Sequence, residues 1–139
     1  MNMNRLFALM VVVVAMSLIA TSAFAAPIAI RIDEVRVDDF VLQPNELNRL
    51  DIQRGQEVPV DIKLTALNDT KNVEVEAFIS GFEFGDIEPI SDATRIFDAD
   101  ANVSYIKRLL IRISDDADED DYKLRIIISD RNSDQIIQT

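Results

Sequence analysis

Alternation of apolar and polar residues is the feature that most constrains this chain, and it is clearest between Tyr105 and Asp130. Side chains on a β-strand point alternately to opposite faces, so an apolar residue at every second position predicts a strand with one buried face. Two such runs lie here, joined by an acidic connector, and we expect them to pair as the central hairpin. The residues predicted to face inward are Tyr105, Lys107, Leu109, Ile111, Ile113, Tyr122, Leu124, Ile126 and Ile128.

The same alternation recurs along the chain, most cleanly from Val58 to Ala66 and then from Val73 to Ile79. Shorter apolar runs occur near residues 28–37, 50–52, 87–90 and 135–139. About seven short runs, without a convincing amphipathic helix among them, predict an all-β fold, an antiparallel immunoglobulin-like β-sandwich. A change of phase at Asp33-Glu34 predicts a bulge. Pro59 cannot donate a ladder hydrogen bond, so its strand should start at a sheet edge or just before pairing begins.

The N-terminal residues have the pattern of a secretory signal. Arg5 is followed by the apolar run Leu6–Ala20, and Ala23-Phe24-Ala25 fits the small-x-small cleavage pattern. We therefore assign residues 1–25 to a signal peptide, forming an N-terminal signal helix, and residues 26–139 to one domain. An uncleaved anchor is the alternative, because the apolar stretch can be extended to about 20 residues. The expected location is outside the cell or in the cell envelope, with membrane contact only through an uncleaved signal segment.

Composition excludes several classes of function. The 139 residues include 14 Lys plus Arg and 25 Asp plus Glu, a net charge of -11, which repels nucleic acid phosphates. Histidine and cysteine are absent. Ser-His and Cys-His catalytic pairs, imidazole ligands and thiolate ligands are therefore impossible. We expect neither an enzyme nor a nucleic-acid-binding protein.

Two acidic stretches are candidate cation sites. Asp98, Asp100 and Asn102 form a D-x-D-x-N spacing that can start a calcium loop, but Val103 and Leu109 stand where an EF-hand needs Gly and Glu. The connector between the two runs holds Asp115, Asp116, Asp118, Glu119, Asp120 and Asp121, of which Asp116, Asp118 and Asp120 are the candidate ligands. Calcium is the one cofactor these stretches suggest. A solvated acidic loop, or a charged turn that keeps strand edges from pairing, is the alternative.

Two further patterns suggest modification and local structure. Asn68-Asp69-Thr70 and Asn102-Val103-Ser104 match the N-glycosylation acceptor pattern, which makes Asn68 and Asn102 candidate glycosylation sites of a secreted chain. Tyr122, at the start of the penultimate predicted strand, stands where a tyrosine corner occurs in immunoglobulin-like domains, although an ordinary half-buried strand tyrosine is equally compatible.

The segments VDIKLTALNDTKNVEVEAFISGFEF and FDADANVSYIKRLLIRISDDADEDDYKLRIIISD resemble the immunoglobulin-like N-terminal domain of predicted archaeal surface-layer and cell-envelope proteins. This resemblance implies a non-catalytic structural or adhesive module whose partners are other envelope proteins or further copies of itself. It also implies further domains, so we expect the reading frame to continue past Thr139 and complete a truncated last strand. The alternative is a carbohydrate- or peptide-binding accessory domain, with Phe78, Phe82, Phe84 and Tyr105 as the possible aromatic platform.

Overall fold

The computed structural model describes residues 27–80, 90–117, 121–130 and 134–138, so the predicted signal segment lies outside the described residues. These ranges contain nine strands and no helix, and therefore no helix long and apolar enough to cross a membrane. The strands are β1 (Ile30–Val37), β2 (Phe40–Val41), β3 (Glu57–Ala66), β4 (Thr70–Ser80), β5 (Ile90–Ala93), β6 (Phe97–Ala99), β7 (Ser104–Arg112), β8 (Lys123–Ser129) and β9 (Asp134–Gln138). The all-β class is confirmed. The described ranges contain more strands than the seven predicted, and two of them, β2 and β6, are very short.

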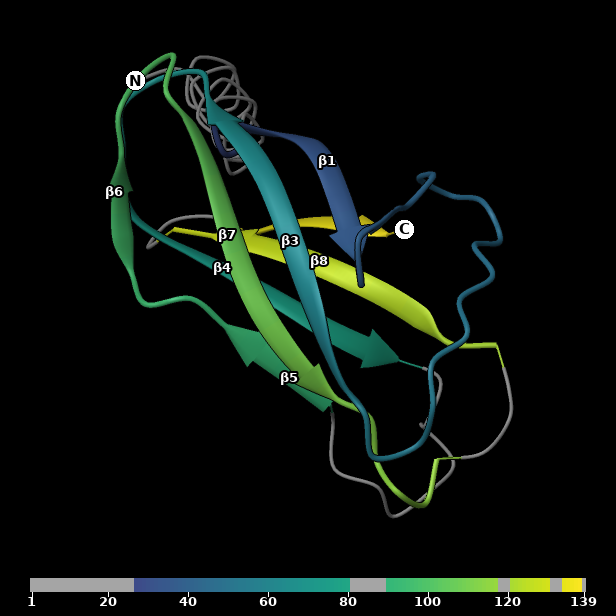
Figure 1. The fold of residues 1–139 in the computed structure, drawn as a ribbon. Helices are drawn as coiled ribbons and strands as arrows, with labels where there is room; N and C mark the ends of the chain where they lie inside the picture. The colour runs from purple at the N-terminus through teal and green to yellow at the C-terminus, as the bar shows by residue number, and fades with distance from the viewer. Residues whose placement is uncertain (1–26, 81–89, 118–120, 131–133, 139) are drawn as a thin grey trace, which may run out of the picture.

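The strands form two antiparallel sheets (Figure 1). One sheet has the order β2-β1-β3-β7, and the other has the order β5-β4-β8-β9, with β6 also pairing with β4. Consecutive long strands lie in different sheets: β3 is followed by β4, and β7 is followed by β8. The chain also returns to the first sheet between β6 and β7, so it crosses between the layers three times.

The predicted hairpin between Tyr105 and Asp130 is wrong. β7 pairs with β3 in one sheet, whereas β8 pairs with β4 in the other. The inward faces were nevertheless assigned correctly for the core of both strands, because Leu109, Ile111, Ile126 and Ile128 are buried. Alternation determines which face of a strand is buried but not which strand lies beside it. Two strands with one apolar face each can thus enclose a core from opposite sides as readily as they can pair.

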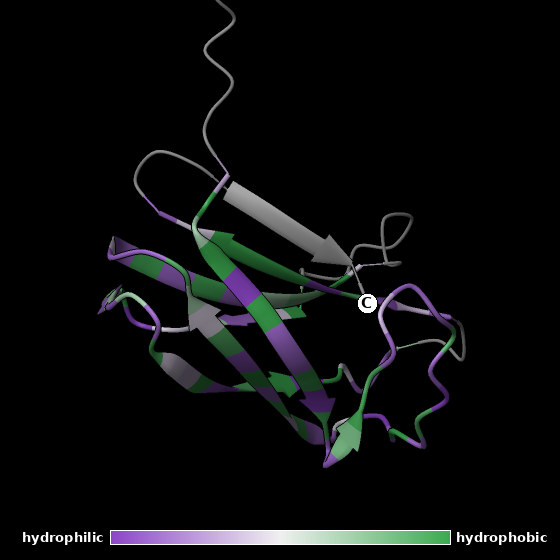
Figure 2. Cartoon of the chain, turned by 90° about the horizontal axis from the view of Figure 1, so that it is seen from above, coloured by the Kyte–Doolittle hydropathy of each residue, from purple (hydrophilic) through white to green (hydrophobic). Residues whose placement is uncertain are grey.

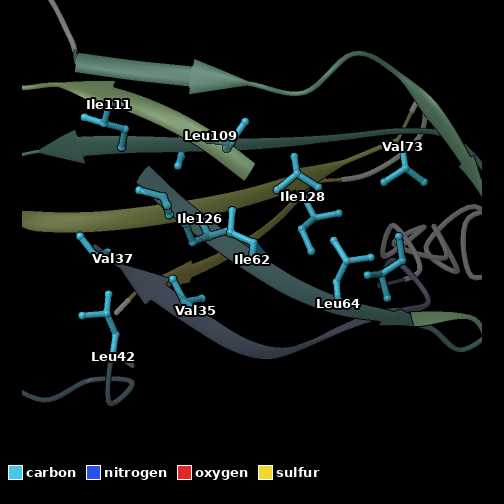
Figure 3. Close-up of a cluster of buried hydrophobic side chains, with 14 of the residues drawn as sticks. Val35, Val37, Leu42, Ile62, Leu64, Val73, Leu109, Ile111, Ile126 and Ile128 are labelled. Carbon is cyan, nitrogen blue, oxygen red and sulfur yellow. The ribbon is translucent and has the colours of Figure 1, made fainter. Parts of the chain in front are cut away.

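The core fills the space between the two sheets. Figure 3 shows side chains of β1, β3 and β7 meeting those of β4 and β8. Ile62, Leu64, Val75, Ile126 and Ile128 are completely buried. Figure 2 shows the same period along the strands as bands of hydrophobic and hydrophilic residues. The alternation in the sequence is thus the direct cause of the two-layered arrangement.

Two local predictions concern β1 and β3. The predicted bulge is confirmed, because the β1–β3 register shifts between Ile32 and Glu34. Pro59 lies in β3, which is a central strand between β1 and β7. Its carbonyl oxygen accepts a hydrogen bond from the N–H of Asp38 (3.0 Å), one residue beyond the end of β1. The proline nitrogen therefore points to the side of β1, just outside the residues that pair with β1. Of the two predicted positions, a sheet edge or just before pairing begins, the structure has the second.

Candidate functional site

A hollow of about 1530 Å³ lies between the segment that joins β2 to β3 and one end of the core. Apolar side chains from both sheets contribute to its lining, among them Val58, Val60, Ile79, Ile111 and Leu124. Charged side chains of both signs also line it, namely Glu46, Arg49, Asp51, Arg54, Asp121 and Lys123. A typical ligand pocket is mostly apolar with a few polar groups, and this hollow is more polar than that, because charged or amide residues make up nine of its 22 lining residues.

The segment between β2 and β3 is irregular, yet side chains fix its first half. Asn48 accepts a hydrogen bond from the Gln43 N–H (2.8 Å) and donates to the carbonyls of Gln43 (2.9 Å) and Glu46 (3.0 Å). After Asn48 the side chains of Leu50 and Ile52 pack against the core, whereas Arg49 and Asp51 are exposed. This alternation suggested a strand, but residues 49–52 form none, because no strand in the described ranges pairs with them.

The turn before β3 contacts the acidic connector. Gly55 has a φ of 72°, and its N–H donates to the carbonyl of Ile113 (3.0 Å). A side chain at this position would meet the carboxylate of Asp115, so both the backbone conformation and the space favour glycine. The beginning of the acidic connector is therefore packed against the turn that leads into β3.

All three residues of the D-x-D-x-N pattern make hydrogen bonds, Asp98 through its side chain and Asp100 and Asn102 through their backbone N–H groups. Asp98 accepts hydrogen bonds from the Asn72 backbone N–H (3.1 Å) and from Lys71 Nζ (3.0 Å), and these bonds hold the pKa of its carboxyl below the usual range. The Asp100 N–H donates to the Tyr105 hydroxyl (2.9 Å), and the Asn102 N–H donates to the Ala66 carbonyl (2.8 Å). Among the residues that the structure describes, no group of three acidic side chains is placed to hold a metal ion. Calcium binding stays a prediction.

Only one of the three candidate ligands in the acidic connector can be placed. Asp116 is exposed, and its N–H donates to Ser114 Oγ (3.2 Å). Asp118 and Asp120 lie outside the described residues. Ala117 beside them is buried, which anchors this part of the connector to the rest of the molecule.

The two candidate glycosylation sites lie at the same end of the molecule. Asn68 and Asn102 are both exposed, in the β3–β4 connection and in the turn before β7. A hydrogen bond from the Ala101 N–H to Asp69 Oδ1 (2.8 Å) joins the two loops. Glycans on both residues would therefore crowd a single end of the fold.

The outer face of the sheet β2-β1-β3-β7 was not anticipated. Arg36, Asp61 and Arg108 stand side by side on β1, β3 and β7, and Arg108 donates two hydrogen bonds of 2.6 Å to the two oxygens of Asp61. A second row runs from Ser104 through Thr65 to Asp33: the two hydroxyl oxygens are 2.7 Å apart, and Thr65 donates to Asp33 (2.5 Å). The alternation of the sequence is enough to assign these residues to an outer face. Which of them lie side by side across the strands depends on the strand register.

These rows predict a specific dependence of stability on pH. The hydrogen bonds from Arg108 lower the pKa of Asp61, and those from Thr65 and Arg31 lower the pKa of Asp33. Each carboxylate therefore stabilises the fold at a pH above its unfolded pKa of about 3.9, and this contribution is lost as the pH falls through the lower folded-state pKa. We expect Asp61→Asn to lose less stability than the wild type between about pH 5 and pH 2. Thermal unfolding followed by circular dichroism measures the difference, and identical pH profiles would contradict the assignment.

No protein-family model matches this chain, and no curated protein is significantly similar to it.

Proposed function

We propose that this chain is a non-catalytic, immunoglobulin-like structural or adhesive module of a secreted or cell-surface protein. The strand arrangement supports the immunoglobulin-like part of the proposal. Strands β1, β3 and β7 share one sheet, β4, β8 and β9 share the other, and the chain changes sheet after β3, after β6 and after β7. Strands B to C and E to F change sheets in the same way in immunoglobulin domains, and Tyr122 directly precedes the equivalent of strand F, where a tyrosine corner stands.

The observation that carries the adhesive role is the outer face of the sheet β2-β1-β3-β7. Three ion pairs lie on this face: Arg108–Asp61, Arg31–Asp33 and Arg36–Glu34. Exposed Ile106 and Leu110 stand beside them on the edge strand β7. Such a surface can contact another protein through its exposed apolar side chains while these ion pairs keep their partners.

Fractionation of the producing cells tests this role. We expect the protein to sediment with the cell envelope and to self-associate after purification, as measured by sedimentation velocity. A protein found only in the medium, and monomeric at every concentration, would overturn the proposal. If cations bridge the copies through the acidic stretches, a chelator is expected to loosen the association while the far-UV spectrum of the monomer stays unchanged.

A second function, binding of a peptide by an accessory domain, is favoured by the hollow. The aromatic platform expected for carbohydrate has less support, because the Tyr105 hydroxyl is bonded to the Asp100 backbone and its ring lies 5.7 Å from that of Phe97. Phe78 is half-buried, and Phe82 and Phe84 lie outside the described residues. A peptide with alternating apolar residues is expected to shift the NMR signals of Leu47, Leu50 and Ile52. Shifts confined to other parts of the protein would contradict this site.

A further inference from the structure

We propose that two copies of this chain associate through their β7 strands, which pair antiparallel about a two-fold axis at Ile106. The inference rests on the assembly role proposed above and names the surface that performs it. The partner is a second copy of the chain, and the result is one continuous sheet of β2-β1-β3-β7 followed by the same four strands in reverse order.

The open edge of β7 is the first observation. β7 is the last strand of its sheet, and no strand in the described ranges pairs with its outer side. The N–H of Leu110 points to this side, because it donates to Asp92 Oδ2 of β5 (2.8 Å). Backbone N–H groups alternate in direction along a strand, so those of Ile106 and Arg108 point the same way. These groups are the template that an added strand would use.

The side chains along this edge suit a protein contact. Ile106 is 71% exposed, more than any other large hydrophobic residue of the described ranges, and Leu110 on the same face is 54% exposed. Arg108 lies between them, with its guanidinium bonded to Asp61. The edge therefore presents apolar surface on both sides of Arg108, whose charge is already paired.

Asp92 determines the register. Its bond to Leu110 occupies the C-terminal part of the edge, so Ser104, Ile106 and Arg108 remain for pairing. A two-fold register centred on Ile106 places each Ile106 against its counterpart and each Arg108 beside the second copy's Ser104. A register centred on Arg108 would place two guanidinium groups opposite each other and would need the N–H that Asp92 already binds.

The charges of the two copies are complementary in this register. The row Arg36, Asp61 and Arg108 of one copy continues into the row Ser104, Thr65 and Asp33 of the other, so a cation is followed by hydroxyl groups and then by a carboxylate. Like charges are not brought into opposite positions on the outer face.

Lys107 is the feature that could oppose pairing, because an inward-pointing charge often protects an edge strand. Here its ammonium group lies 3.5 Å from the centroid of the Phe97 ring and 5.6 Å from that of Tyr105. The charge is therefore held against aromatic rings on the inner side of the strand, away from the groups that would pair.

Cysteine cross-linking tests the register directly, because the native chain contains no cysteine. Directly opposed residues in a hydrogen-bonded antiparallel pair have Cα atoms about 5.5 Å apart, within the range of a disulfide. We expect Ile106→Cys to form a covalent dimer under mild oxidation of the full chain. Arg108→Cys and Leu110→Cys, on the same face of the same strand, are the matched controls and should not cross-link. Cross-linking of Arg108→Cys instead would overturn the register.

A second measurement separates this proposal from the assembly role itself. In the proposed dimer, Ile106→Lys places the ammonium groups of the two copies next to each other at the two-fold axis, where they repel. We expect the dimer dissociation constant to rise at least about tenfold, equivalent to about 1.4 kcal/mol. Sedimentation velocity measures the change, and an unchanged circular dichroism spectrum shows that the exposed substitution preserves the fold. If the wild type associates but neither substitution at Ile106 has its expected effect, the β7 interface is wrong and the assembly role stands. If the wild type stays monomeric, both are wrong.

Discussion

Ile126→Ala is expected to lower the free energy of unfolding by about 2–5 kcal/mol, the usual cost of removing a large aliphatic side chain from a core. Ile126 is completely buried in the middle of β8, opposite Ala77 of β4 and Ile137 of β9. Its side chain points into the space between the sheets, where β3 and β7 cover it from the other layer (Figure 3). The small side chain of Ala77 beside it cannot expand to fill the cavity, so we expect a value in the upper half of this range.

Ile127→Ala is the matched control for Ile126→Ala. Ile127 is the next residue of the same strand, so it points to the opposite face, where it is only half-buried. The substitution removes the same atoms but creates no enclosed cavity, and the expected loss is about 1 kcal/mol, typical of a partly exposed site. Urea unfolding curves of the two variants measure the difference. Equal losses would show that β8 does not have the inner and outer faces described here.

The faces of the strands could be predicted because they depend on local sequence. The runs Val58 to Ala66 and Val73 to Ile79 both form long strands, and the residues expected to face inward are buried except Ile79, which is half-buried. The partner of each strand could not be predicted in this way. Pairing depends on contacts between distant residues, so the run beginning at Tyr105 was wrongly paired with the next run along the chain, whereas it lies beside β3. The crossing of the chain between layers leaves no local pattern.

The features of the candidate sites also divide into those that depend on local sequence and those that depend on contacts between distant residues. The exposure of Asn68 and Asn102 followed from turn-forming residues nearby. The engagement of Asp98 with Lys71 and Asn72 did not, because it requires β6 to lie beside β4, and β6 is only three residues long. The bond between Asp92 and Leu110 likewise joins two sheets. Such contacts become visible only when the register of the strands is known.

Asp61→Pro is expected to cost far more stability than Asp61→Ala, although both remove the carboxylate that binds Arg108. Pro59 O accepts from Asp38 and Leu67 N donates to Ala29, so the odd-numbered residues of β3 direct their backbone groups towards β1. Asp61 lies opposite Arg36 in this ladder, away from the bulge. Proline at this position removes a ladder donor in a central strand and inserts its ring between β1 and β3.

The extra cost of Asp61→Pro is at least about 1–3 kcal/mol, the penalty for leaving a backbone group without its partner. Pro59→Ala is the complementary control: the native proline stands beyond the end of β1, so its removal is expected to change stability by less than about 1 kcal/mol. Chemical unfolding of the three variants measures both differences. If Asp61→Pro and Asp61→Ala were equally stable, β3 would not pair with β1 at this residue, and the central position of β3 would be wrong.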